Sequence, residues 1–293
     1  MSQPFNYEEI FMGVHVGKPK SYLRTFKQDY RLKRLKETLK ITKGRMLDIG
    51  CGGGVVTESL PYYYPQISVY GCDVSRTAIN YARKYGSGKV KYAMLIGKKF
   101  PFRDNFFDVC ICLDVMEHVP DVHFFLKEVK RILKKNGKFF LSVPCEGELL
   151  TFTWFFQKVK LGKMLTFKHW GHIHPEFTHK RVERLMARKG FSIVSKTYSE
   201  HWFYQLINLT MYFLPKEILE LILGKNKASQ YADRSFISAA IHGKNQRDLL
   251  GLLRDVWLGL TGIVGYLRNW ETETFKNVSF GAWKLHLLAV KHK

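Results

Sequence analysis

Two acids and a run of glycines lie close together in this sequence, at the end of one strand-like segment and of the next. Residues 46–54 read MLDIGCGGG, so an apolar run contains Asp48 and passes directly into glycines. The following apolar segment, ISVYGCDVS, ends in Asp73, 19 residues after Gly54. Glycine lets a backbone turn sharply and a ligand approach it closely. A carboxylate after the second strand can accept hydrogen bonds from ribose hydroxyls. The pattern predicts a nucleotide-binding cradle.

The glycine spacing indicates which nucleotide the cradle binds. A dinucleotide fingerprint starting at Gly50 needs its third glycine at position 55, which is Val55. The chain has G-x-G-x-G instead, and Asp48 would repel a diphosphate. An acid at that place favours a ligand that carries an ammonium and a sulfonium group, so we expect a cationic nucleoside.

The surrounding pattern must supply the elements that position these acids. Strands are predicted at 45–50, 67–72, 89–94, 106–113 and 138–143, and helices at 54–63, 75–85 and 121–136. Asp121 is the expected N-cap and Gly137 the expected stop of the last of these helices. Thr178 caps a further helix, and a sixth strand follows at 191–200. Strands alternating with helices predict a mostly parallel sheet with its ligand at the carboxyl edge.

Four blocks in order, MLDIGCGGG, YGCDVS, FPFRDNFFDVCICLDVMEHVPD and RILKKNGKFFLSVP, resemble the class I S-adenosylmethionine (SAM)-dependent methyltransferases. The resemblance covers positions 45–200 and the last strand. It implies an α/β fold with a doubly wound, mostly parallel seven-stranded Rossmann-like sheet, whose last strand is antiparallel. The implied cofactor is SAM, and the implied function is a methylation catalysed by a transferase.

The resemblance also assigns the donor-binding residues. It places the methionine part of SAM at Asp48 and the first glycines, the ribose at Asp73, and the adenine against Val74, with Leu113 near the donor. The full expected set is Asp48, Gly50, Cys51, Gly52, Gly54, Asp73, Val74 and Leu113. Ile96 stands about where many relatives have an acid for the adenine amine, so backbone contacts are expected there.

The string DVMEH, Asp114 to His118, offers a possible metal site. Side chains at i, i+3 and i+4 can share a helical face, and two carboxylates with an imidazole can bind a divalent ion. The string resembles the E-x-x-E-H site of polyprenyl-benzoquinone O-methyltransferases and small-RNA 2′-O-methyltransferases, with Asp114 one carbon shorter. We expect no metal, with Glu117 and His118 shaping the wall beside the donor methyl. The alternative is a metal on Asp114, Glu117 and His118.

Residues 145–177 follow the fifth strand, where this fold builds its acceptor pocket. They are rich in aromatic residues and contain His169, His172 and His174. A neutral imidazole can take a proton from a phenol or an alcohol at working pH. The candidate bases are His118, His172 and His174, and the alternative is a helical hairpin with surface histidines.

Two further segments flank the predicted core of 45–200. Residues 1–44 are read as an N-terminal helical lid or covering helix, with Leu23, Phe26, Tyr30 and Leu35 at helical spacing. Residues 201–282 are an expected apolar helical insertion between strands 6 and 7, and 283–293 the last core strand. The insertion's tryptophans, tyrosines and basic flanks are typical of an interfacial helix. A buried helix pair or a dimer interface is the alternative.

Charge and cysteine usage limit the setting of the protein. The formal net charge is +22, which implies an anionic partner surface or simply a basic, solubilising one. Five cysteines without C-x-x-C spacing argue against a disulfide scaffold, so we expect reduced, structural thiols. No secretory signal is evident, and we expect a cytoplasmic protein, peripheral on the inner membrane face where it binds membrane.

The predicted function is methyl transfer from SAM to an oxygen or carbon of a hydrophobic or lipid-like small molecule. An RNA methyltransferase would use the basic surface for phosphate contacts, but no appended RNA-binding module is recognisable, so nucleic acid is the weaker partner. The third alternative is a non-catalytic SAM-binding scaffold subunit. The sequence leaves open whether the protein forms a homo-oligomer.

Overall fold

The computed structural model describes residues 30–159, 171–207, 266–267 and 269–292. The chain divides into two compact units. The larger consists of Met1–Tyr198 and Asn277–Lys293, and the smaller of Ser199–Lys276. The predicted domain limits stay predictions. The segments 1–29 and 208–265, which hold most of the predicted lid and insertion, lie outside the described residues.

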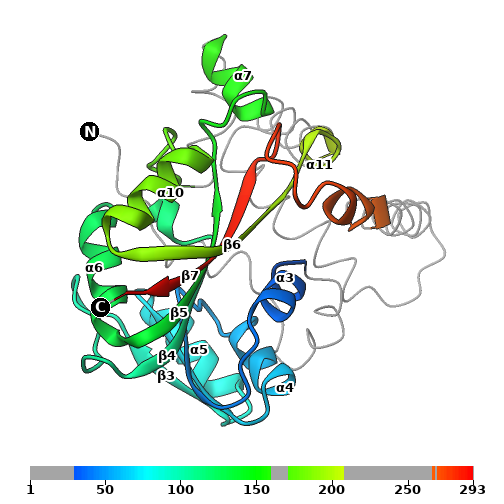
Figure 1. The fold of residues 1–293 in the computed structure, drawn as a ribbon. Helices are drawn as coiled ribbons and strands as arrows, with labels where there is room; N and C mark the ends of the chain where they lie inside the picture. The colour runs from blue at the N-terminus through cyan, green and yellow to red at the C-terminus, as the bar shows by residue number, and fades with distance from the viewer. Residues whose placement is uncertain (1–29, 160–170, 208–265, 268, 293) are drawn as a thin grey trace, which may run out of the picture. The chain divides into compact units, whose positions relative to one another are not determined.

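The larger unit is built on a seven-stranded sheet with the order β3-β2-β1-β4-β5-β7-β6 (Figure 1). The strands are β1 (Gly44–Ile49), β2 (Ile67–Asp73), β3 (Val90–Met94), β4 (Phe107–Leu113), β5 (Leu133–Pro144), β6 (Phe191–Ser199) and β7 (Lys284–Lys291). Strands β1 to β5 pair in parallel, and β7 runs antiparallel to β5. The order reverses at β1, whose neighbours are β2 and β4. The doubly wound Rossmann-like fold predicted from the sequence is confirmed.

Helices cover both faces of this sheet (Figure 1). They are α3 (Tyr30–Thr38), α4 (Leu60–Tyr63), α5 (Arg76–Tyr85), α6 (Val122–Ile132) and α10 (His179–Arg188). A further helix, α7 (Phe152–Lys158), has no buried residue and lies beyond the ends of the strands (Figure 1). One core cluster joins Phe125 of α6 and Leu185 of α10 to the sheet, and the other joins Leu35 of α3 and Leu60 of α4 to its opposite face. The sheet core is therefore buried on both sides, as a parallel sheet requires.

Three helix starts follow the capping chemistry of the sequence. The side chains of Ser75, Asp121 and Thr178 accept hydrogen bonds from backbone N–H groups three residues ahead, at the starts of α5, α6 and α10. The predicted caps at Asp121 and Thr178 are confirmed. The five cysteines are all buried free thiols, as expected.

Two predicted helices differ from the observed ones. The expected helix at 54–63 is a 3-10 turn, Thr57–Ser59, followed by the single turn of α4. Pro61 explains the break, because it has no N–H for the carbonyl one turn earlier. The expected helix at 121–136 ends at Ile132, because Leu133 pairs with Phe107 and opens β5.

The smaller unit is described only at its two ends. Helix α11 (Trp202–Ile207) begins with two N–H groups, of Phe203 and Tyr204, that donate to the carboxylate of Glu271 at 2.8 and 3.2 Å. A carboxylate at a helix N-terminus is favoured by the helix dipole. No helix in the described part of the chain combines the length and apolarity that crossing a bilayer requires.

Candidate functional site

The glycine turn after β1 forms one wall of the site. The N–H groups of Gly50 and Cys51 both donate to the carbonyl of Cys72 on β2, at 2.8 and 3.0 Å. Gly50 has φ +73°, and a Cβ there would lie 2.3 Å from the Val115 side chain. Gly52 has φ +51°, and a Cβ there would meet nothing within 4 Å. The turn needs glycine at position 50 for its own packing, whereas position 52 faces open space.

Asp73 ties the end of β2 to this turn. Its Oδ2 accepts the N–H of Gly52 at 2.7 Å, and its Oδ1 accepts the N–H of Ser75 at 2.9 Å. These bonds fix the carboxylate beside the glycine turn, at the carboxyl edge of the sheet. A carboxylate in this place can accept hydrogen bonds from a ribose.

Asp48 lies buried at the end of β1 with an exposed fraction of 3%. The hydroxyl of Thr57 donates to its Oδ2 at 2.7 Å. Burial raises the pKa of Asp48 to about 7, the charge of Asp73 adds to this, and the Thr57 hydrogen bond opposes it. A cationic ligand beside Asp48 would favour the ionised form, as the sequence-based interpretation requires.

The other expected donor-binding residues lie around the same edge. Val74 is half-exposed directly after β2, Leu113 ends β4 and is almost buried, and Ile96 is exposed. Cys51 is buried within the turn, and Gly54 packs against the Tyr92 ring, whose hydroxyl oxygen would lie 2.4 Å from an added Cβ. These positions agree with a nucleoside site, and their roles stay predictions.

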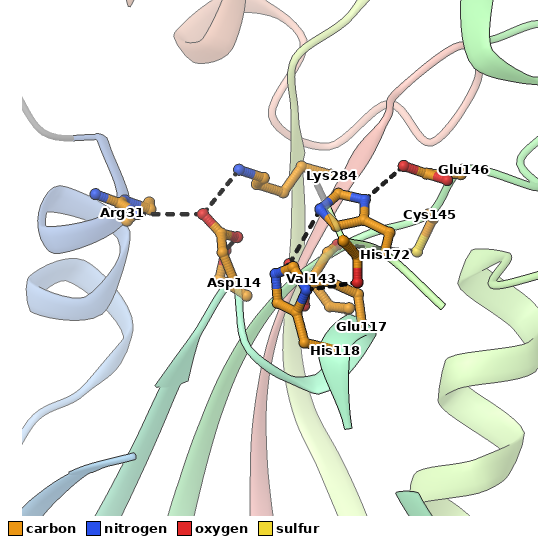
Figure 2. Close-up of polar contacts among 11 residues, drawn as sticks. Arg31, Asp114, Glu117, His118, Val143, Cys145, Glu146, His172 and Lys284 are labelled. Atoms are coloured by element: carbon orange, nitrogen blue, oxygen red, sulfur yellow. Dashed lines mark hydrogen bonds and ion pairs between the residues drawn. The ribbon is translucent and has the colours of Figure 1, made fainter. Parts of the chain in front are cut away.

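Asp114 is not on one helical face with Glu117 and His118. It has a positive φ of 56°, and a 3-10 turn, Met116–His118, follows it instead of an α-helix. Its Oδ2 pairs with Arg31 of α3 and with Lys284 of β7, each at 3.1 Å (Figure 2). Burial opposes its ionisation, but the two cations lower the pKa of Asp114 to about 2. Asp114 is thus a stable carboxylate engaged with two cations.

Glu117 and two histidines form a second cluster (Figure 2). Glu117 is 2% exposed, and neither carboxylate oxygen accepts a hydrogen bond from any described residue. Its Oε1 lies 3.9 Å from Nε2 of His118 and 3.9 Å from Nε2 of His172. The two imidazole rings meet edge to face with centroids 5.0 Å apart. One ligand atom from each residue lies within 4.8 Å of the others, so the three could hold a metal ion.

The far side of each imidazole is fixed by a partner. Nδ1 of His118 donates to the carbonyl of Gly171 at 3.0 Å, and Nδ1 of His172 lies 2.5 Å from Oε1 of Glu146. A carbonyl only accepts, so the neutral His118 ring carries its proton on Nδ1. Both Nε2 atoms are therefore on the side of Glu117.

Burial dominates the electrostatics of this cluster. It raises the pKa of Glu117 well above its usual range, with the charge of Asp114 adding to the effect, and raises the pKa of Glu146 to about 9. It lowers the pKa of His118, and lowers that of His172 to about 4. The imidazoles are neutral near pH 7, which suits both proton acceptance and metal ligation.

His174 lies among other contacts. Its Nε2 donates to the carbonyl of Val119 at 2.8 Å, and its ring stacks on Phe177 with centroids 4.7 Å apart. These contacts indicate that His174 anchors its loop, and the role of His174 as a base stays a prediction. His169 lies outside the described residues.

Sequence reasoning missed three residues of the site: Glu146, Lys284 and Arg31. Glu146 comes after Cys145, just beyond the end of β5, so its place near the carboxyl edge of the sheet was the available signal. Lys284 comes from the antiparallel β7 and Arg31 from α3, and no local pattern links either to Asp114. The strand order brings Lys284 near Asp114, and the packing of α3 on the sheet brings Arg31 there.

Comparison with known proteins supports the resemblance to methyltransferases. Residues 47–141 match the model of the methyltransferase domain family. The ubiquinone biosynthesis O-methyltransferase of Pelagibacter ubique is 35% identical over 117 residues, which are 39% of this chain and 47% of that protein. The chain thus spans about half the length of the curated relatives it matches.

Solved structures show the same fold. A phosphoethanolamine N-methyltransferase of Haemonchus contortus in complex with SAM has a TM-score of 0.55 at 18% identity, over 99% of this chain and 60% of that one. A complex between the Haloferax volcanii Trm112 methyltransferase activator and a methyltransferase has a TM-score of 0.54 at 15% identity. The match covers 99% of this chain and 100% of that one. The match of residues 47–141 and the order of the sheet both support the resemblance to the class I SAM-dependent methyltransferases that the four sequence blocks carry.

Proposed function

We propose that the protein transfers a methyl group from SAM to an oxygen or carbon of a hydrophobic, lipid-like acceptor. The observation that carries the proposal is the cradle, in which Asp48 and Asp73 bracket an open glycine turn at the point where the strand order reverses. Ligands of open α/β sheets bind at such a reversal.

The residues of the cradle have distinct tasks in this proposal. Asp48 faces the ammonium end of the donor, Asp73 accepts from its ribose hydroxyls, and the backbone at Gly52 allows its close approach. SAM supplies an electrophilic methyl group. The protein aligns the acceptor with that methyl and excludes water, which accelerates the reaction through proximity and orientation.

The cluster of Glu117, His118 and His172 handles the acceptor proton. A neutral imidazole of the cluster can accept a proton from an acceptor hydroxyl. The same three residues fit a divalent ion, because the Glu117 oxygens accept no hydrogen bond from any described residue and the two Nε2 atoms lie on their side. Such an ion would lower the pKa of an acceptor hydroxyl.

The hydrophobic acceptor is supported by three observations. The curated relatives are named ubiquinone biosynthesis O-methyltransferases, and ubiquinones carry apolar tails. The net charge of +22 suits an anionic membrane surface. In the smaller unit, Trp202, Tyr266 and Trp270 are exposed, as aromatic anchors at a membrane interface are. We propose that the protein is cytoplasmic and peripheral on the inner face of the membrane.

The N-terminal segment is proposed to cover the site. Leu32, Leu35 and Leu39 of this segment are buried against the sheet, and Arg31 of α3 reaches Asp114. A helix that both packs on the core and contacts the end of β4 suits a lid over the acceptor mouth. Residues 1–29 lie outside the described residues.

The test is incubation of the protein with labelled SAM and separate lipid, RNA and protein fractions of a cell extract. We expect label in the lipid fraction, abolished by Asp48→Ala with Asp104→Asn as the control. Label in RNA alone would favour an RNA methyltransferase. SAM binding without transfer to any fraction would favour the scaffold role.

A further inference from the structure

Glu117, His118 and His172 are the residues proposed above to hold a divalent ion, and their surroundings decide which groups can join them. Two acids lie close to this cluster and face it differently. Asp114 is engaged by two cations, whereas Glu146 contacts the far nitrogen of His172. The sequence alone offered Asp114 as a ligand and gave no role to Glu146.

We infer that Glu146 positions His172 as the third ligand, and that Lys284 and Arg31 keep Asp114 out of the ligand set. The inference rests on the proposed function, since it assigns the positioning residues of the ion held by Glu117, His118 and His172. The site would then have two imidazoles and one carboxylate as its protein ligands, which is a set that suits Mn²⁺, Fe²⁺ or Co²⁺.

The role of Glu146 follows from geometry. Its Oε1 lies 2.5 Å from Nδ1 of His172, while Nε2 of the same ring lies 3.9 Å from Glu117. A ligating histidine typically donates its other N–H to a carboxylate, which fixes the tautomer and the ring orientation. The main-chain carbonyl of Glu146 also accepts from Thr153 and Gln157, each at 3.2 Å, so α7 holds the residue in place.

The exclusion of Asp114 follows from its backbone and its partners. Its φ of 56° turns the residue out of the 3-10 turn that carries Glu117 and His118. Its Oδ2 has both cations at 3.1 Å, and the side chain of Lys284 is only 8% exposed. Moving this carboxylate to an ion would break a buried ion pair, which is unfavourable.

The experiment is titration of the purified full-length protein with Mn²⁺ and Co²⁺, by calorimetry, by Mn²⁺ electron paramagnetic resonance and by visible absorption of Co²⁺. We expect His172→Ala to weaken binding at least 100-fold and Glu146→Ala to weaken it 10- to 100-fold. Glu146→Gln, whose amide oxygen can still accept from Nδ1, should recover most of the affinity. Asp114→Asn should stay within threefold of the unaltered protein, and so should His174→Ala.

The inference is overturned if Asp114→Asn loses as much affinity as His172→Ala, or if Glu146→Ala binds either ion normally. Each variant is first checked for SAM affinity and melting temperature, so that a loss of fold is recognised. If the unaltered protein binds SAM but neither ion, the inference fails and the proposed methyl transfer stands. If it does not bind SAM, the proposed function itself fails.

Discussion

The Oδ2 atom of Asp73 lies 2.7 Å from the backbone nitrogen of Gly52 and accepts its hydrogen bond, although 21 residues separate the two. The acid that ends β2 thus holds the glycine turn that follows β1. The turn and the acid can be positioned only together, so the proposed donor site depends on the pairing of these two neighbouring strands.

Asp73→Asn tests this dependence. The amide keeps one acceptor but replaces the other with an N–H₂ group, which cannot accept from Gly52 or Ser75. Hydrogen bonds to a charged group contribute about 1.5–3 kcal/mol, so SAM affinity should fall about 10- to 100-fold by calorimetry. Asp104→Asn, which alters an exposed ion pair with Arg131, is the control and should bind SAM normally. Equal affinities of the two variants would contradict the assignment.

Gly50→Ala should mainly lower the stability of the protein, whereas Gly52→Ala should mainly weaken SAM binding. At position 50 the new Cβ would lie 2.3 Å from Val115, so we expect several kcal/mol of destabilisation, seen as a lower melting temperature. At position 52 the space is open and φ is +51°, so the stability cost is about 1 kcal/mol, but the methyl group enters the cradle and weakens SAM binding.

The double variant Gly50→Ala with Val115→Ala is the matched control, because it removes the atoms that the new Cβ meets. It should recover part of the lost melting temperature. Two glycine variants with the same stability and the same SAM affinity would show that the turn does not face the donor.

Local chemistry explains which parts of the fold were predictable. Ser75, Asp121 and Thr178 cap helices through their own side chains, and the alternation of apolar residues marks each parallel strand. The two wrong helix limits arise from Pro61, which lacks an N–H, and from Leu133, which pairs with a strand distant in sequence. Neither effect is visible from helical periodicity.

Some residues of the candidate site were predictable from the sequence, and others were not. Asp48, Asp73 and the glycine turn follow from one motif and the end of the next strand, so the sequence was sufficient to predict them. The pairing of Asp114 with Lys284 joins residues 170 positions apart, and the contact of Glu146 with His172 depends on how a loop folds back. Such contacts follow from sheet order and loop path, which no motif encodes.

The affinity for SAM should depend on pH through Asp48. Its pKa of about 7 in the ligand-free protein means that the carboxyl is neutral at pH 6. A cationic ligand binds the ionised form, so affinity should fall about tenfold for each pH unit below 7 and level off above it. Calorimetry from pH 5.5 to pH 8 measures this, and Asp48→Asn should bind weakly with no such slope. A flat profile for the unaltered protein would contradict the prediction.

The same shift predicts the stability of the ligand-free protein. The folded-state pKa of Asp48 is raised above 3.8, so the folded state holds the proton more tightly and its stability falls as pH rises from about 4 to 7. Asp48→Asn removes this effect. Its advantage in the free energy of unfolding should therefore grow by roughly 2–3 kcal/mol between pH 5 and pH 8. Urea unfolding at the two pH values measures the difference, and a constant difference would contradict the assigned burial.

The ion pair between Asp114 and Lys284 should be strongly coupled. Both side chains are largely removed from water, with exposed fractions of 27% and 8%, and Arg31 shares the same carboxylate oxygen. Lys284→Met leaves Asp114 with one cation, and Asp114→Asn leaves the ammonium of Lys284 without a carboxylate, so each should destabilise the protein by about 2–4 kcal/mol. The double variant leaves no uncompensated charge between the two positions and should lose about 1–3 kcal/mol less than the sum of the single variants.

The pair of Lys196 with Glu183, whose exposed fractions are 48% and 25%, is the matched surface control and should show a coupling below about 1 kcal/mol. Equal coupling energies for the two pairs, measured by urea unfolding, would show that Lys284 is not the group that holds Asp114.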